Sequence, residues 1–173
     1  MTESQPLKRP RFFEGQLLTA ADLELEQQYF IEKHKLHNRA LHGFGIVSGL
    51  KVTVSAGQII VAPGLAIDCE GNELVVHSEQ TLTVSGLVDL RIAYLGLRYV
   101  EKCVDLIPGS EQHSRVQESF ELVFASENSN RGHRHARGRW LPCGQPHALT
   151  IAKLRAITHG WRVERRYRPP MMK

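Results

Sequence analysis

The sequence lacks the features that mark membrane-spanning and secreted proteins. No apolar run of about 18 residues, the length that a membrane-spanning helix needs, occurs among its 173 residues. Residues 1–10 are polar and have no apolar core of the kind found in a secretory signal, so no such signal is expected. The cysteines are odd in number and far apart, which argues against a disulfide framework and favours free thiols in a reducing compartment. They are Cys69, Cys103 and Cys143.

Sequence signatures of catalysis are also missing. The glycines of segment 43–49 follow a predicted helix and lead into a predicted strand, the reverse of their order in a dinucleotide-binding loop. No nucleophile elbow, zinc-protease helix motif or calcium loop is present. The carboxylate pairs Asp68/Glu70 and Glu118/Glu121 are explained by roles in turns and on strand faces. We therefore expect a protein that is not an enzyme and that needs no cofactor.

Composition favours one folded domain with an uneven charge distribution. Hydrophobic residues make up 42% of the chain and charged residues 23%, which is ordinary for a globular protein. Residues 131–173 hold eleven Lys or Arg and one acid, a net charge of +10, whereas residues 1–130 hold eleven basic and seventeen acidic residues, a net charge of −6. The basic quarter suits nucleic acid, an anionic surface or an acidic neighbouring subunit, and a solvated rim explains it equally well.

A helix is predicted over residues 19–43, after an arm that spans residues 1–18. Thr19 is a good N-cap, and Asp22 places negative charge at the positive end of the helix dipole. Gly43 suits the backbone conformation in which helices commonly end. Apolar residues form two neighbouring stripes along this segment, so we expect a long amphipathic helix that packs against a sheet.

The rest of the chain is rich in short strands. Apolar segments recur about every ten residues, separated by turns that contain glycine, proline and asparagine, which is typical of an antiparallel sandwich or barrel. The predicted class is α+β: a long N-terminal amphipathic helix followed by a mainly antiparallel β-sandwich or barrel. The β-rich domain is expected over residues 44–166, with polar loops at 101–118 and 126–144 and a tail at 167–173.

A pattern typical of metal ligands lies in the second polar loop. His133 and His135 form an H-x-H pair, with Cys143 and His147 downstream, and residues i and i+2 of a strand point the same way. Two imidazoles could share a transition metal, and a threefold axis would supply six nitrogens. A solvated loop rich in arginine and histidine explains the same residues, and the three arginines of segment 131–137 disfavour a cation. Both interpretations stay open.

Candidate partner contacts occur near both ends of the chain. An aromatic pair follows the basic arm and needs burial, either against the helix or against another subunit. The candidates are Arg9, Arg11, Phe12 and Phe13 in the arm and Arg165, Arg166 and Arg168 near the C-terminus. Nucleic acid is the weaker alternative partner, because few aromatic residues of the basic quarter could stack on bases.

Three segments resemble small proteins of contractile phage tails and phage-tail-like injection systems. Segment 12–29 reads FFEGQLLTAADLELEQQY, in which an aromatic pair, a glycine and a Leu-Thr-Ala-x-Asp start precede Glu-Gln-x-Tyr. Segment 36–50, LHNRALHGFGIVSGL, is similar to a second block of that family, and segment 61–75, VAPGLAIDCEGNELV, to its Pro-Gly-x-Ala-x-Asp-x-x-Gly-x-Glu strand pair. The likeness is looser over residues 94–124, and residues 152–155 depart from the family pattern.

The resemblance implies a structural part of a tail-like particle near its baseplate. Such a protein acts by assembly with other baseplate or tail subunits, is multimeric in the particle, and has no enzymatic activity. It is made in the cytoplasm and then becomes part of a virion or injection particle. Two alternatives remain: a metal-bound trimeric tip or fastener that uses the H-x-H pair, and a nucleic-acid-binding module that uses the basic C-terminal quarter.

Overall fold

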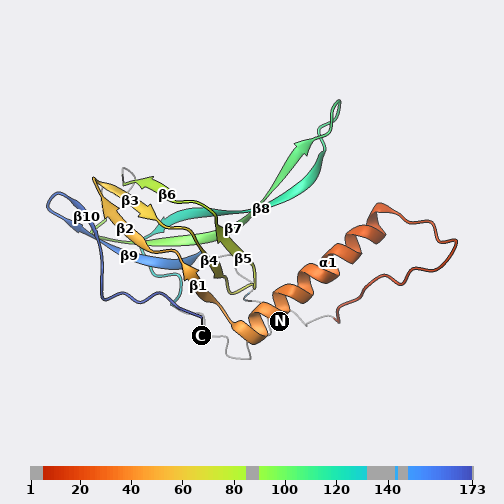
Figure 1. Ribbon diagram of the computed structural model, residues 1–173, viewed down its shortest axis with the longest axis horizontal. Coiled ribbons are helices and arrows are strands. Elements are labelled where there is room, and N and C mark those ends of the chain that lie inside the picture. The colour runs from red at the N-terminus through yellow and green to blue at the C-terminus, as the bar shows by residue number, and fades with distance from the viewer. Residues whose placement is uncertain (1–5, 85–89, 132–142, 144–147, 173) are drawn as a thin grey trace.

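The computed structural model describes residues 6–84, 90–131, 143 and 148–172. A body of β-strands carries two projections that extend from the same side of it: the N-terminal helix and the tip of one long β-hairpin (Figure 1). The N-terminal arm curves around the far end of the helix and runs back below it in this view. The predicted α+β class with mainly antiparallel strands is confirmed.

The helix is shorter than predicted. α1 spans Ala20–His37, 18 residues or about 27 Å, and a π-helical turn, η1, follows over Asn38–His42. Thr19 is the N-cap, as expected: its side chain accepts the N–H of Asp22, and the Asp22 carboxylate accepts the N–H of Thr19. Gly43, at φ +81°, ends the helical run. The α-helix gives way to the wider turn at the point where the chain meets the body.

α1 does not pack against a sheet, which corrects the prediction of a long amphipathic helix lying on one. None of its residues is buried, and Phe30 is 60% exposed. The helix approaches the body only at its C-terminal end, so its apolar side chains stay at the surface (Figure 1). No helix in the described part of the chain is long and apolar enough to cross a membrane.

Ten strands in the described ranges form three sheets, and the strands paired within each sheet are antiparallel. The first sheet has the order β1-β4-β5 and comprises β1 (Gly45–Gly49), β4 (Gly64–Ile67) and β5 (Glu73–Val76). The second has the order β2-β3-β6 and comprises β2 (Val52–Ser55), β3 (Gln58–Val61) and β6 (Gln80–Thr83). The third has the order β10-β9-β7-β8 and comprises β7 (Ile92–Leu106), β8 (His113–Ala125), β9 (Leu149–Ile157) and β10 (Gly160–Val163).

The core is built by side chains from all three sheets. Leu95 and Leu97 of β7 and Leu154 of β9 are fully buried, and they belong to one cluster with Ile59 of β3 and Leu74 of β5. β5 buries every second residue, as a strand with one face on a core does. Burying one leucine or isoleucine side chain contributes about 1.5–3 kcal/mol. The stability of the protein therefore resides in the sheets.

The polar segment 101–118, predicted as a loop, is instead the outer half of a β-hairpin. β7 and β8 stay paired from Tyr94 opposite Ala125 to Leu106 opposite His113, and a short turn joins them. This ribbon projects beyond the body, so most of its residues are exposed on both faces (Figure 1). A strand with neither face on a core needs no alternating apolar pattern, and this is why the segment looks like a loop in the sequence.

The C-terminal segment lies along the body. The Asn130 side chain donates to the carbonyl oxygen of Thr150 at 2.8 Å and accepts the Thr150 N–H at 2.9 Å, and the Tyr167 hydroxyl donates to the same carbonyl at 3.3 Å. Farther on, the N–H of Ile46 donates to the carbonyl oxygen of Pro170 at 2.8 Å. Through residue 172 the predicted tail is thus attached to β9 and β1.

Candidate functional site

The helix is attached to the body through two buried polar side chains. Asn38 is 4% exposed and Arg39 is 6% exposed, at the start of η1. Asn38 Nδ2 donates to the carbonyl oxygen of Gly71 at 3.0 Å and to Glu73 Oε1 at 3.2 Å. Arg39 Nη1 donates to the carbonyl oxygen of Glu70 at 2.5 Å. Buried polar groups are costly unless they are paired, so these bonds fix the helix to the turn between β4 and β5.

That turn is shaped by one carboxylate at the end of β4. Asp68 Oδ1 accepts the backbone N–H groups of Glu70 and Asn72, both at 2.9 Å, and Asp68 Oδ2 accepts Asn72 Nδ2 at 2.8 Å. An aspartate that captures nearby backbone groups defines a turn without help from other elements. We call this turn, residues 68–73, the socket, because it receives the end of the helix.

Gly71 allows the helix to come close to the socket. Its φ is +89°, which a residue with a Cβ rarely adopts. A Cβ built on Gly71 would lie 2.3 Å from the carbonyl oxygen of Lys35, in the last turn of α1. The backbone of the helix and the backbone of the socket are therefore in direct contact at this glycine.

A small polar hollow of about 200 Å³ opens beside the socket. Its walls include His34, Glu73, Tyr99 and Glu118, and His34 Nε2 lies 3.3 Å from Glu73 Oε1. Burial raises the pKa of the Tyr99 hydroxyl, and its hydrogen bond to Glu101 Oε1 at 2.9 Å raises it further. Small-molecule sites usually enclose about 300–1,000 Å³, so we assign this hollow to helix attachment.

The arm and the helix together expose many large apolar side chains. Leu17 is 85% exposed and Phe13 is 70% exposed. We call this set the apolar arm surface. It consists of Phe12, Phe13, Leu17, Leu18, Leu23, Leu25, Phe30 and Ile31. Single exposed apolar residues are common on protein surfaces, but this many large ones in one short stretch of chain are typical of a segment that another protein covers.

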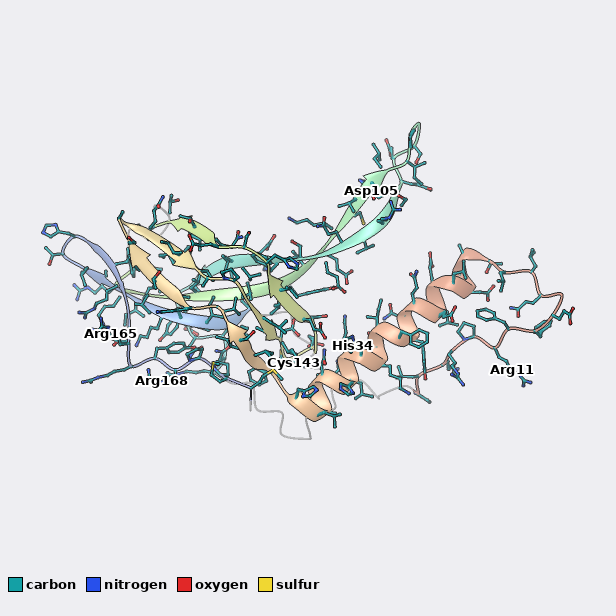
Figure 2. All side chains as sticks on the ribbon, viewed as in Figure 1. Arg11, His34, Asp105, Cys143, Arg165 and Arg168 are labelled. Carbon is teal, nitrogen blue, oxygen red and sulfur yellow. The ribbon has the colours of Figure 1, made fainter. Side chains whose placement is uncertain are left out.

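The predicted partner residues fall into two groups that the fold keeps apart. Arg11, in the arm, lies at one end of the molecule, and Arg165 and Arg168 lie at the other, beside the C-terminal segment (Figure 2). The aromatic pair belongs to the apolar arm surface. All seven predicted residues are exposed: Arg9, Arg11, Phe12, Phe13, Arg165, Arg166 and Arg168.

The predicted metal pair, His133 and His135, lies outside the described residues, and most of the loop predicted at 126–144 does too. That metal site stays a prediction, as does nucleic-acid binding by the basic quarter.

Sequence reasoning missed the two residues that attach the helix. Asn38 and Arg39 belong to one of the family-like segments, and their partners belong to another. Polar residues are frequent along the whole helix, so nothing in the sequence distinguishes these two from residues on its exposed surface. Their pairing with residues 70–73 could not be read from the sequence, because it depends on the folded turn.

No protein-family model and no curated protein sequence matches the chain. Its fold, however, is similar to two solved structures. A chain of the type VI secretion system TssK-TssF-TssG baseplate subcomplex, seen by cryo-electron microscopy, aligns with a TM-score of 0.61 and 12% identity over 96% of this chain and 62% of that one. A chain of the baseplate complex from the type VI secretion system aligns with a TM-score of 0.59 and 12% identity, over 96% of this chain and 42% of the other.

The chain is thus similar in fold to part of two type VI secretion baseplate chains. The expected resemblance to proteins of contractile baseplates is thus confirmed at the level of the fold. The likeness spans nearly all of this chain but only about 62% and 42% of the two baseplate chains.

Proposed function

We propose that the protein is a structural adaptor of a contractile baseplate, in a phage tail or a tail-like injection particle. It acts through protein–protein contacts and without catalysis. It is made in the cytoplasm, is present in several copies in the particle, and binds other baseplate subunits. The similarity to chains of multi-subunit baseplate complexes, over 96% of this chain, is the observation that carries the proposal.

The distribution of apolar side chains supports an adaptor role. The sheets bury their apolar residues, whereas the apolar arm surface keeps Phe13 70% exposed and Leu17 85% exposed. Interfaces draw most of their binding energy from a few large side chains, aromatic ones above all. The arm therefore carries the anchor residues that a neighbouring subunit would cover.

Attachment of the helix at one end also suits this role. The socket fixes the C-terminal end of α1 through Asn38 and Arg39, and the remaining turns extend away from the body. A partner can then pack along the whole helix without first displacing it from a sheet. The adaptor would join the partner on the arm to whatever the β-sheet body contacts.

Co-expression with candidate baseplate and tail subunits from the same genome tests the proposal. The expected result is a stable complex in size-exclusion chromatography with light scattering. The double variant Phe13→Ser/Leu17→Ser should weaken that complex at least about 30-fold, equivalent to about 2 kcal/mol, because it removes two exposed anchors. Calorimetry with the purified partner measures the change.

A matched control tests whether the loss of binding is specific to the arm or follows from removing any exposed apolar side chain. Val75 is 40% exposed on β5, and Val75→Thr should leave the affinity unchanged. Circular dichroism and the thermal midpoint should be the same for the wild type and both variants, since none of the altered residues is buried. A chain that stays monomeric and captures no tail protein, or that binds equally well after the double substitution, would refute the adaptor proposal.

A further inference from the structure

Two cysteines and a glutamate meet at the socket. The Sγ atoms of Cys69 and Cys143 and a carboxylate oxygen of Glu70 all lie within 4.8 Å of one another. Cys69 is 5% exposed, and the other two residues are half-buried. Within the described residues, this is the one group of three or more potential metal ligands. Cys143 lies near the point where α1 meets the sheets (Figure 2).

The donor atoms suit a cation that accepts both sulfur and oxygen ligands. Zn²⁺ binds thiolates at about 2.3 Å and carboxylate oxygens at about 2.0–2.2 Å, in a tetrahedral arrangement. Tetrahedral bonds of these lengths place neighbouring ligand atoms about 3.5–4 Å apart. The three side chains are already within 4.8 Å, so only small side-chain movements separate them from this geometry.

Two of the ligands sit on a preorganised turn. Cys69 and Glu70 belong to the socket, which is held by three hydrogen bonds to the Asp68 carboxylate, two from backbone N–H groups and one from the Asn72 side chain. Arg39 holds the carbonyl oxygen of Glu70 from the other side. Ligands on a rigid turn lose little conformational freedom when a metal binds, which favours affinity.

The charges at this place also favour a cation. Glu70 places a carboxylate beside the two thiols. A divalent cation stabilises neighbouring thiolates and carboxylates together. Two thiolates, one carboxylate and a divalent cation sum to one net negative charge, which the guanidinium of Arg39 can offset.

We propose that Cys69, Glu70 and Cys143 form a binding site for Zn²⁺ or a similar thiophilic divalent cation. A water molecule would complete the tetrahedron as the fourth ligand. The cation would fasten Cys143 to the socket, next to the attachment of the helix. The proposed ligands are other residues than the H-x-H pair, and the site does not depend on the baseplate role.

Metal analysis of the full chain, purified under reducing conditions from zinc-supplemented cells, tests the site. The wild type should retain about one zinc per chain. Cys69→Ser and Cys143→Ser should each raise the dissociation constant for Zn²⁺ at least about 100-fold, the upper end of the loss seen for residues that only support a ligand. Glu70→Gln should raise it about tenfold. Competition with a chromogenic chelator measures all three.

The third cysteine provides a matched control. Cys103 is exposed on the outer hairpin, and Cys103→Ser should keep the zinc affinity of the wild type. Titration with Co²⁺ gives a second readout, because coordination by sulfur produces a thiolate-to-cobalt charge-transfer band. The wild type and Cys103→Ser should show that band, whereas the double variant Cys69→Ser/Cys143→Ser should not.

Three results would overturn the site. The first is a wild type with less than about 0.1 zinc per chain that also shows no thiolate band with Co²⁺. The second is loss of the zinc in His133→Ala/His135→Ala but not in the cysteine variants. The third is a disulfide between Cys69 and Cys143 that persists in protein purified under reducing conditions, seen as one titratable thiol in place of three. Thermal unfolding checks each variant; if Cys69→Ser is unfolded, the comparison between Cys143→Ser and Cys103→Ser decides.

Discussion

The sheets bury their apolar side chains, whereas the arm and helix expose side chains of the same kinds. In the sheets, Leu95, Leu97 and Leu154 have no exposed surface, whereas in the arm and helix Leu17 is 85% exposed and Leu23 is 50% exposed. Leucine supplies apolar surface in both regions, and only its surroundings differ. The sheets therefore hold the free energy of folding, and the arm holds apolar surface that remains available for association.

Within the described residues the two regions meet at and around the socket, where polar contacts dominate, and Lys35 Nζ lies 5.9 Å from the centre of the Tyr99 ring beside it. Asn38 and Arg39 attach the helix with hydrogen bonds to backbone oxygens, where a sheet-packed helix would use an apolar face. Such bonds depend on direction, so they fix the angle of the helix while burying little apolar area. The direction in which the helix leaves the body is therefore set by the hydrogen bonds at its C-terminal end.

The largest expected effect distinguishes a buried leucine from an exposed one. Leu95→Ala should destabilise the protein by about 3–5 kcal/mol, because it leaves a cavity in a site with no exposed surface. Leu17→Ala should change the free energy of unfolding by less than about 0.5 kcal/mol, since that side chain is 85% exposed. Urea denaturation followed by fluorescence measures both. Similar losses in the two variants would mean that the arm is part of the folding core.

A second comparison tests the close approach of the helix and the socket. Gly71→Ala should destabilise the protein by about 2–4 kcal/mol, because the new Cβ would lie 2.3 Å from the carbonyl oxygen of Lys35 and φ is +89°. Gly57→Ala is the control: φ is +75°, but no atom lies within 4 Å of the new Cβ. That variant should lose only about 1–2 kcal/mol, the cost of the backbone conformation.

Hydrogen exchange shows where the Gly71→Ala loss falls. Amides of α1 and η1 should exchange faster than the global loss of stability alone would explain. Amides of β7 and β9 should change their exchange rates only as much as the global stability changes. Equal destabilisation in Gly71→Ala and Gly57→Ala would contradict the tight contact at the socket.

Removing the amide that attaches the helix should have a smaller effect. Asn38→Ala loses the hydrogen bonds to the Gly71 carbonyl and to Glu73. The buried carbonyl oxygen of Gly71 then lacks the donor that Asn38 supplied. The expected loss is about 1–2 kcal/mol. Asn72→Ala offers a comparison within the socket, because it removes one bond to Asp68 and none to the helix. Faster exchange of the α1 amides in Asn38→Ala alone would confirm that Asn38 sets the attachment.

The sequence predicted the elements better than their arrangement. Thr19 and Gly43 mark the ends of the helical run because a cap and a positive φ are local requirements. The strands of the body followed from apolar segments and turns for the same reason. The packing of α1 was predicted wrongly, because apolar residues along a helix do not by themselves show which surface, if any, of the same chain covers them.

Features that depend on contacts between distant parts of the chain could not be predicted from the sequence. The outer hairpin has no side that faces the core, so the sequence of segment 101–118 has no alternation of apolar and polar residues. Its strands are defined only by the pairing of β7 with β8. The convergence of Cys69 with Cys143 depends on how the chain between them folds. The exposure of the seven predicted partner residues was predictable, because aromatic and basic residues near a polar chain end have little to pack against, and their role in binding stays a prediction.

The smallest expected effect concerns the first turn of α1, far from the socket. Hydrogen bonds from the Thr19 side chain and backbone hold the pKa of Asp22 below its ordinary value of 3.8. The ionised carboxylate therefore favours the capped helix at every pH above about 3.8, and this contribution is lost as the pH falls through the lowered pKa. An NMR titration of the Asp22 carboxyl should show the lowered value.

Thr19→Ala should bring the pKa of Asp22 back toward 3.8, since it removes the larger of the two hydrogen-bond contributions. Ser110→Ala, in the turn of the outer hairpin, should leave it unchanged. The amides of the first helical turn should exchange faster in Thr19→Ala, while the urea midpoint of the sheets stays the same, because α1 adds no buried residue to the core. A fall in that midpoint would show that the two ends of the molecule fold as one cooperative unit, and that the helix is supported by more than its base.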